Sequence, residues 1–318
     1  MAVTRAVAIV EPGGPEVLRV VERDVREPGP GEVRLAVRAA AVNPTDIALR
    51  QRGDDSTPPP WVPGMDAAGA VESVGAGVER LAVGDEVMAV VTPRRPEGGA
   101  QAQLVVVPEA SVVPIPEGAT LEQAATLPMN GVTALRGLEL LDLEPGATLA
   151  VTGGAGLLAS YVIPIAKQRG LRVLADAGPA DAELVRGFGA DVVLPRGDDL
   201  PEAMRAAAPG GVDAVFDTAV LGRGIFSGIR TGGALAFVRT WDGDDVESGI
   251  EIHRVLVREV LERTAWLQEL SELAARGVLA LRVAATLPPE QCAEAHRRLE
   301  AGGLRGRAVI VFDQVRVT

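Results

Sequence analysis

The chain has 318 residues, of which 47% are hydrophobic and 23% are charged, a composition typical of a globular protein with a sizeable core. Its net charge of −12 argues against nucleic acid or an anionic membrane surface as partner. The sequence contains neither an apolar run of the ~18 residues that a membrane helix needs nor a signal-peptide cleavage site, so we expect a cytoplasmic protein.

The sequence offers few residues for metal or disulfide chemistry. A single cysteine, Cys292, excludes an intrachain disulfide framework and is predicted to be a small hydrophobic residue on a helix face. The two histidines, His253 and His296, are far apart and cannot form a zinc site rich in Cys and His. We therefore expect no metal, and chemistry that comes from a bound organic cofactor or from carboxylates.

Short alternating segments at 32–42, 84–91 and 101–108, separated by Gly and Pro, predict β-strands in the first third of the chain. Residues 120–141 have helical spacing and begin with a capping box. From there to about residue 240, apolar strands alternate five times with helical stretches, which predicts a parallel sheet covered on both faces. A helix is expected around 255–276, and the final segments return to β-type texture.

The predicted fold class is therefore α/β, with a doubly wound parallel-sheet domain inserted into a β-rich domain built from both ends of the chain. We place the β-rich domain at 1–119 and 263–318, and the doubly wound domain at 120–262. The strand at 234–239 is expected at a sheet edge, where pairing with a second copy would give a homodimer.

The stretch VTGGAGLLASY (151–161) stands between an apolar strand and a helix, where a dinucleotide-binding loop of a Rossmann fold must stand. Gly154-x-Gly156-x-x-Ala159 supplies the tight turn, the close approach to the pyrophosphate and the small packing residue, and a longer match begins at Gly153. The alternative is a tight turn that binds no nucleotide. The candidate cofactor-binding residues of the loop are Gly153, Gly154, Ala155, Gly156, Leu157 and Leu158.

Asp176 ends the next strand, near the ~20-residue offset at which a carboxylate binds the ribose hydroxyls. It would repel a 2′-phosphate, and the segment 177–181 offers no basic residue, so the loop favours NAD(H) over NADP(H). Arg196, after the third strand, argues the other way because it can reach the adenosine end. Asp176 as a simple helix cap is the alternative.

Four motifs point to a known family: VNPTDIALR (42–50), the spaced glycines of 58–87 that end in GDEV, LPMNGVTAL (127–135) and GGLRGRAVIVF (302–312). Over nearly its whole length the chain resembles the zinc-independent medium-chain dehydrogenases/reductases of the quinone oxidoreductase (zeta-crystallin-like) branch. The resemblance implies a Rossmann cofactor domain, a GroES-like β-rich catalytic domain, a homodimer and, in this branch, NADPH as the usual cofactor.

The chain also departs from the pattern of the family that it resembles. Gly64-Met65-Asp66 stands where zinc-dependent relatives have Gly-His-Glu, and the cysteine-rich structural lobe is missing. Leu157 makes the phosphate loop bulkier than the family's Gly-Gly-Val-Gly, and Pro164 stands inside the following helix.

By resemblance, the cleft is lined from both domains. Asn43, Asp46 and Thr133 are the candidate catalytic residues, although Asn43 to Asp46 also fit a capped turn into a helix. Asn130, Arg239 and Thr240 are further candidates for cofactor binding. Met65 and Trp241 are candidates for substrate contact; Trp241 either forms an aromatic wall or anchors its loop. His253 either shuttles a proton or is a surface or core histidine.

The predicted function is hydride transfer from NAD(P)H to a quinone or an α,β-unsaturated carbonyl, whose own carbonyl stabilises the incoming charge without a metal. Two alternatives stay open. One is a non-catalytic nucleotide-binding protein of the same fold, and the other is an enoyl or ketone reductase that tailors a polyketide-like metabolite.

Overall fold

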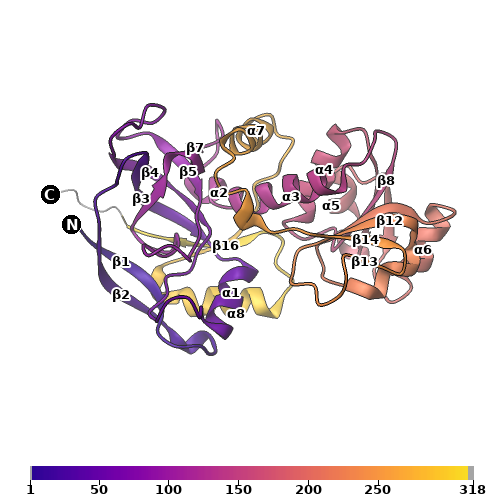
Figure 1. Ribbon diagram of the computed structural model, residues 1–318, viewed down its shortest axis with the longest axis horizontal. Helices are drawn as coiled ribbons and strands as arrows, with labels where there is room; N and C mark the ends of the chain where they lie inside the picture. The colour runs from indigo at the N-terminus through magenta and orange to yellow at the C-terminus, as the bar shows by residue number, and fades with distance from the viewer. Residues whose placement is uncertain (1, 314–318) are drawn as a thin grey trace. The chain divides into compact units, whose positions relative to one another are not determined.

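The computed structural model describes residues 2–313 and divides into two compact units (Figure 1). Unit 1 comprises Met1–Met129, Leu261–Gly277 and Leu281–Thr318, and unit 2 comprises Asn130–Val260 and Val278–Ala280. The mixed α/β class expected from the sequence is confirmed.

Unit 1 is built on β-structure that is antiparallel except for the parallel pair β15 (Val283–Leu287) and β16 (Arg307–Val311). Strand β1 (Ala2–Ile9) pairs with β2 (Leu18–Val25). A larger sheet has the order β15, β16, β3 (Glu32–Ala41), β4 (Asp66–Val74), β5 (Glu86–Val90) and β7 (Val112–Pro114), and β6 (Leu104–Pro108) also pairs with β3. Because β16 pairs antiparallel with β3, the end of the chain completes a sheet begun in its first third. The β-rich domain formed from both chain ends is thus confirmed.

The helices of unit 1 are α1 (Pro44–Arg52), the short α2 (Leu121–Ala124), α7 (Thr264–Ala275) and α8 (Cys292–Ala301). Alternate residues of β3, Val33, Leu35 and Val37, are fully buried, and they share one hydrophobic core with Cys292 of α8. Burial raises the pKa of the Cys292 thiol to about 11, so the side chain is a neutral core residue, as predicted.

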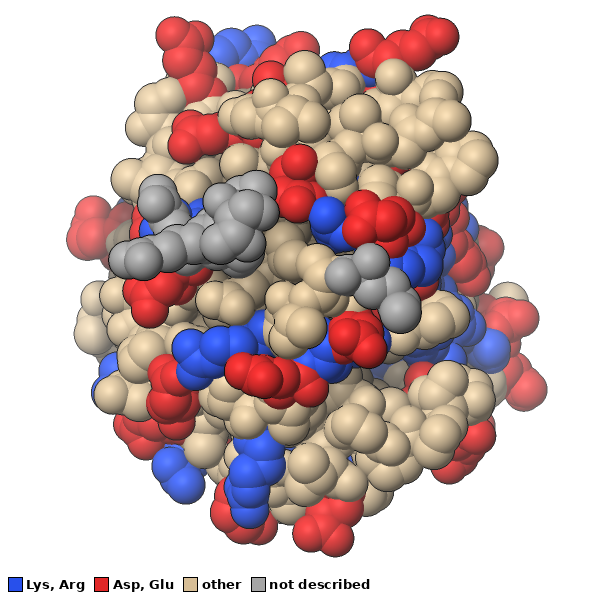
Figure 2. All heavy atoms as spheres, turned by 90° about the vertical axis from the view of Figure 1, so that its left-hand side faces the viewer, with Lys and Arg blue, Asp and Glu red and all other residues tan. Residues whose placement is uncertain are grey.

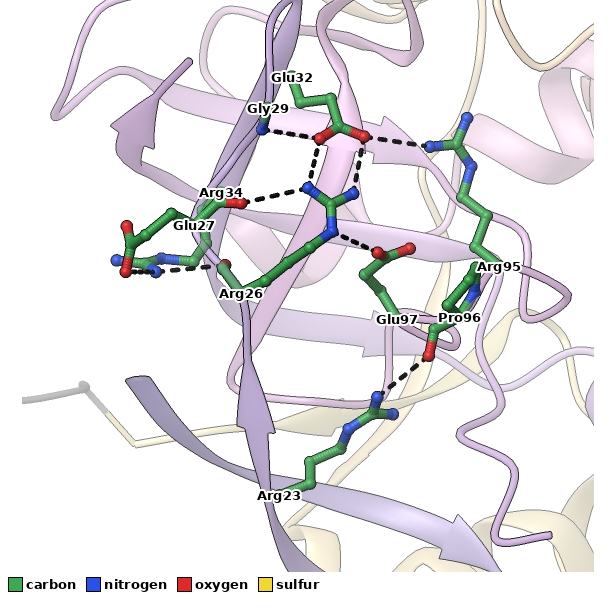
Figure 3. Close-up of polar contacts among 9 residues, drawn as sticks. All are labelled: Arg23, Arg26, Glu27, Gly29, Glu32, Arg34, Arg95, Pro96 and Glu97. Atoms are coloured by element: carbon green, nitrogen blue, oxygen red, sulfur yellow. Dashed lines mark hydrogen bonds and ion pairs between the residues drawn. The ribbon is translucent and has the colours of Figure 1, made fainter. Parts of the chain in front are cut away.

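A network of ion pairs fastens the loop at 94–97 to the start of β3 (Figure 3). Arg26 contacts both Glu32 and Glu97 at 2.5 Å, and Arg95 lies 3.8 Å from Glu32. Hydrogen bonding from Arg26 lowers the pKa of Glu32 to about 2. The face of the molecule drawn in Figure 2 shows acidic and basic side chains interspersed, which is not the single-sign surface of a polyanion binder.

Unit 2 contains the doubly wound sheet. Its order is β10 (Val192–Pro195), β9 (Arg172–Ala177), β8 (Thr148–Thr152), β11 (Val212–Asp217), β12 (Ile229–Phe237), β14 (Ile250–Arg254) and β13 (Val246–Glu247). All neighbouring strands are parallel except β13 and β14. Helices α4 (Ala159–Gln168), α5 (Ala182–Gly187) and α6 (Leu200–Ala207) connect successive strands, and α3 (Pro128–Leu141) precedes β8. The order reverses at β8, so the carboxyl ends of β8 and its neighbours form the topological switch point of the sheet.

Three expectations about individual elements are wrong. The strand expected at the edge, 234–239, overlaps β12, which pairs with β11 on one side and β14 on the other. The edge strands of this sheet are β10 and β13. The segment after β11 forms a 3-10 helix (Gly222–Gly228) because its three glycines disfavour a longer α-helix. The helix expected around 255–276 begins only at Thr264.

Candidate active site

The loop between β8 and α4 holds the predicted phosphate-binding residues. Gly153 has a φ of +66°, which glycine adopts without strain, and the N–H of Gly156 donates to the carbonyl of Gly153 at 2.8 Å. A Cβ at Gly154 would lie 2.7 Å from the backbone oxygen of Asp176. The backbone itself therefore requires glycine at 153 and 154, as the dinucleotide-binding pattern assumes.

The same loop leaves hydrogen-bond donors available at the start of α4. Within residues 2–313, the backbone N–H groups of Leu157 and Leu158 meet no acceptor. Because a helix N-terminus combines such donors with the positive end of its dipole, this loop fits a pyrophosphate. The side chain of Leu157 is only 2% exposed, so its bulk is buried. Pro164 lies inside α4, which continues to Gln168.

Asp176 and Arg196 meet at the carboxyl ends of β9 and β10. The Asp176 carboxylate accepts a hydrogen bond from the N–H of Gly153 and lies 3.1 Å from Nε of Arg196. Asp176 is buried, whereas the side chain of Arg196 is 56% exposed. Asp176, which favours NAD(H), and Arg196, which favours NADP(H), thus form one ion pair beside the glycine loop.

In unit 1, Asn43 and Asp46 lie together at the start of α1. Both are fully buried. The Asp46 carboxylate accepts from the backbone N–H of Asn43 at 2.7 Å and of Gly64 at 2.8 Å, and from Nε2 of Gln101 at 3.4 Å. The interpretation as a capped turn therefore describes the local structure, with Asp46 at the third helical position.

Asn43 extends this cluster to two residues that sequence reasoning missed. Its Nδ2 donates to Oδ2 of Asp66 at 2.6 Å, and its Oδ1 accepts from Nε of Arg307 at 2.8 Å. Oδ1 of Asp66 accepts the backbone N–H of Met129 at 2.6 Å. Asp66 is the first residue of β4 and Arg307 is the first residue of β16. A charged residue at the start of an apolar segment is the only signal that the sequence offered.

Two carboxyl groups and one guanidinium thus share an interior site. Burial raises the pKa of Asp46 to about 6 and that of Asp66 to about 7, against the hydrogen bonds that stabilise the ionised forms. The negative charge of Asp46 raises the pKa of Asp66 further, and Arg307 opposes it. Burial therefore favours the protonated, uncharged form of these two carboxyl groups.

The remaining candidates near these elements are buried. Met65, directly before Asp66, is 6% exposed, and its carbonyl accepts from the N–H of Val91 at 2.8 Å. Asn130 and Thr133 lie one turn apart on α3 in unit 2 and are 2% and 6% exposed. Their roles toward cofactor and substrate stay predictions.

After β12, Arg239 and Thr240 are exposed, whereas Trp241 is 7% exposed and lies in the hydrophobic core of unit 2. The Trp241 ring meets Phe237 edge to face at 5.0 Å, and the Arg223 guanidinium lies 4.7 Å from its centroid. These contacts are those of a loop anchor. A substrate contact by Trp241 stays a prediction, as do the cofactor contacts of Arg239 and Thr240.

In the described part of the chain, no three His, Cys, Asp or Glu side chains are grouped so that they could hold a metal ion. Nor does any described helix have the length and apolar character to cross a membrane. His253 is partly buried, and its Nε2 lies 3.6 Å from Oε1 of Glu251. In sequence it is far from Asn43 and Asp46.

Comparison with known families matches residues 29–117 to the alcohol dehydrogenase GroES-like domain and residues 188–310 to the zinc-binding dehydrogenase domain. The chain is 36% identical over 218 residues to an NADPH-dependent alkenal/one oxidoreductase of Arabidopsis thaliana, covering 64% of this chain and 54% of that protein. It is 34% identical over 195 residues to the pikromycin polyketide synthase component PikAII of Streptomyces venezuelae, covering 60% of this chain and 5% of that protein. Quinone oxidoreductase homologues are also similar.

Solved structures agree with the sequence comparison. An NAD-dependent alcohol dehydrogenase superposes with a TM-score of 0.83 at 29% identity, covering 97% of this chain and all of the other. The chain spans about half the length of the alkenal/one oxidoreductase and of a 2-methylene-furan-3-one reductase of Solanum lycopersicum, and 5% of the polyketide synthase component. The chain belongs to the medium-chain dehydrogenase/reductase family, which confirms the resemblance seen in its motifs.

Proposed function

We propose that the protein is an NAD(P)H-dependent oxidoreductase that reduces quinones or α,β-unsaturated carbonyl compounds without a catalytic metal. The observation that carries the proposal is the β8–α4 loop, where the N–H groups of Leu157 and Leu158 lack acceptors among the described residues, close in sequence to the glycines that the backbone requires. Relatives named as alkenal/one and quinone oxidoreductases support the choice of acceptor.

A bound reduced nicotinamide supplies a hydride, and the acceptor completes its two-electron reduction by taking one proton from water. The task of the protein is to bind and orient the acceptor and to keep bulk water away from the hydride while it is transferred. Leu157 and Leu158 donate to the pyrophosphate, and Asp176 with Arg196 binds the adenosine ribose. We keep Asn43, Asp46 and Thr133 as the proposed catalytic residues, Asn130, Arg239 and Thr240 as further cofactor contacts, and Met65 and Trp241 as substrate contacts.

The preference for NAD(H) over NADP(H), expected from Asp176 alone, needs revision in this proposal. Both carboxylate oxygens of Asp176 already accept hydrogen bonds, from Gly153 and from Arg196. Pairing with a guanidinium weakens the repulsion of a 2′-phosphate, and the exposed side chain of Arg196 offers that phosphate a cation. We propose that NADP(H) binds as well as NAD(H), as the name of the relative from Arabidopsis thaliana suggests.

The first test is a paired fluorescence titration of the purified protein with NADH and NADPH. The variant Gly156→Val places a branched side chain where the phosphates are proposed to bind. A Cβ there would lie 3.0 Å from the carbonyl oxygen of Gly153, so the loop has to shift slightly to accept it. Gly187→Val is the matched control, because no atom lies within 4 Å of a Cβ there. Saturable binding that Gly156→Val abolishes and Gly187→Val leaves intact supports the proposal. If neither cofactor binds, the loop is only a turn and the proposal is wrong.

A second candidate function is enoyl or ketone reduction of a polyketide-like substrate, favoured by the similarity to a polyketide synthase component. Turnover of a thioester-linked enoyl substrate, with free quinones inert, would favour this candidate. Cofactor binding without turnover on any quinone, enone or ketone would instead indicate a non-catalytic binding protein.

Three further features stay proposals: the domain division at 119/120 and 262/263, a cytoplasmic location, and a homodimer. For the dimer, strand β13 is one of the two edges of the unit 2 sheet, and its Val246 is 62% exposed. Light scattering of the protein and of Val246→Lys tests whether copies pair through this edge, because a charge there should dissociate such a pair.

A further inference from the structure

The turn that follows β11 contains a residue in an unusual conformation. Val220 has a φ of +62°, a left-handed conformation that a β-branched side chain rarely adopts. The other non-glycine residues with positive φ in the described chain are Asp142 and Ser248, neither of which is β-branched. A strained valine persists only where its surroundings hold it.

The surroundings of Val220 hold it from both sides. Before it, the N–H of Ala219 donates to Oγ1 of Thr152 at 3.0 Å, and Oγ1 of Thr218 donates to the carbonyl of Thr152. After it, the N–H of Gly222 donates to Oδ2 of Asp217 at 2.8 Å. Thr152 and Asp217 are themselves joined, because Oγ1 of Thr152 donates to Oδ1 of Asp217 at 2.6 Å, and both are fully buried.

This turn lies against the glycine loop of the same unit. A Cβ on Gly153 would come within 3.2 Å of the Cβ of Ala219 and of Oγ1 of Thr218. Two apolar side chains stand exposed at its apex, Val220 at 39% and Leu221 at 45%. The carboxyl-terminal edge of a parallel sheet is where ligands bind, so these side chains are offered to a ligand rather than to the core.

The sheet order says which part of a dinucleotide they meet. Strand β8, whose end carries the phosphate loop, lies between β9 on one side and β11 on the other. Asp176, the proposed ribose residue, is the last residue but one of β9. The other half of the dinucleotide, which carries the nicotinamide, therefore extends over β11 and its turn.

We infer that Val220 and Leu221 form an apolar contact that selects the reduced, neutral nicotinamide ring over the oxidised, cationic one. This inference rests on the proposed function and adds a direction to it, since such a site favours the cofactor form that gives up a hydride. A cation loses more hydration than a neutral ring when it contacts apolar side chains. The charged group of the same turn, Asp217, is fully buried with both oxygens accepting hydrogen bonds.

The test compares Val220→Asn with Val220→Asp in the full chain. The two variants have the same shape, both tolerate the left-handed conformation, and they differ only in charge. We measure the dissociation constants of the oxidised and reduced forms of whichever cofactor, NAD or NADP, binds the wild type. Because the phosphates are the same in both forms, their repulsion cancels in the ratio of the two constants.

The wild type should bind the reduced form more tightly, Val220→Asn should weaken that preference, and Val220→Asp should favour the oxidised form by about fivefold relative to Val220→Asn. Leu221→Asn and Leu221→Asp form a second pair that needs no change at the strained position. The pair Ser248→Asn and Ser248→Asp is the control, because Ser248 has a similar φ of +54° and lies in the β13–β14 hairpin.

Thermal melting of the protein without cofactor gives an independent readout. Val220→Asn should raise Tm, because it removes the strain of a β-branched left-handed residue. A ratio that is equal in the Asn and Asp variants at both positions, or tighter binding of the oxidised form by the wild type, overturns the inference while the proposed function stands. If the wild type binds no form of NAD or NADP, the proposed function itself is contradicted.

Discussion

Nδ2 of Asn43 donates to Oδ2 of Asp66 at 2.6 Å, inside unit 1 and out of reach of water. Since Arg307 donates to the Oδ1 of the same amide, the orientation of Asn43 is fixed by its partners. Asp66 also accepts the N–H of Met129 in the first turn of α3. One buried amide thus links the start of α1 to the start of β4 and, through Asp66, to the start of α3.

The replacement Asp66→Asn should alter how stability depends on pH. Burial raises the pKa of Asp66 from 3.8 to about 7, so between these values the folded protein holds a proton that the unfolded chain has lost. The resulting contribution to the free energy of unfolding is present in full below pH ~3.8 and is lost as pH rises through ~7. We expect the free energy of unfolding of the wild type, relative to Asp66→Asn, to fall by on the order of 2 kcal/mol between pH 5 and 8 in urea titrations. A difference that does not change with pH would contradict the raised pKa.

His296 should act in the opposite direction. Its ring is fully buried, with Nδ1 3.2 Å from Nη1 of Arg50, and burial lowers its pKa from 6.5 to about 4. Between these values the unfolded chain binds a proton that the folded protein does not bind. The stability of the fold with a neutral His296 is therefore present in full above pH ~6.5 and is lost as pH falls toward ~4.

The variant His296→Leu keeps an apolar filling and removes the titration. The wild type should lose on the order of 2 kcal/mol more than His296→Leu between pH 7 and 4.5, measured by urea unfolding. Equal acid sensitivity in the two proteins would show that the ring is charged or exposed. Because the Asp66 and His296 effects have opposite signs in overlapping pH ranges, each single variant should show a pH dependence that the wild type partly conceals.

The glycine loop gives a prediction about packing. Gly154→Ala places a Cβ 2.7 Å from the backbone oxygen of Asp176 and 3.1 Å from the Cβ of Ala175, so β8 and β9 cannot keep their spacing at the loop. We expect a loss of about 1–3 kcal/mol, seen as a lower Tm. Gly178→Ala, with nothing within 4 Å of its Cβ, should leave Tm nearly unchanged. A wild-type Tm for Gly154→Ala would show that the loop moves freely.

Local patterns explain which parts of the fold could be predicted from sequence. The alternation of apolar strands and helices and the glycine loop are encoded within a few residues of each other, so the doubly wound domain and its binding edge follow from periodicity. The edge strand was misplaced because β13 has only two residues, Val246 and Glu247, too few for a periodic signal.

The buried cluster could not be predicted in the same way. Asn43 is 23 residues from Asp66 and 264 from Arg307, and no local pattern joins positions so far apart. Single polar residues in apolar segments were the available signal. The strain at Val220 also depends on the hydrogen bonds around it and not on its neighbours in sequence, so only the structure shows it.

Arg196 and Asp176 provide the last prediction, on cofactor choice. If Arg196 binds the 2′-phosphate, Arg196→Gln should weaken NADPH binding about tenfold, because the phosphate loses its cationic partner. NADH binding should change little, since NADH has no 2′-phosphate. Within the described chain, the Arg196 guanidinium is the only cation paired with Asp176. Asp176→Asn removes the carboxylate that binds the ribose hydroxyls and should weaken NADH more than NADPH. The measurement is a fluorescence titration of both cofactors with both variants. Equal losses for the two cofactors in Arg196→Gln would show that Arg196 only orders Asp176 and that the 2′-phosphate, if bound, is held by another residue.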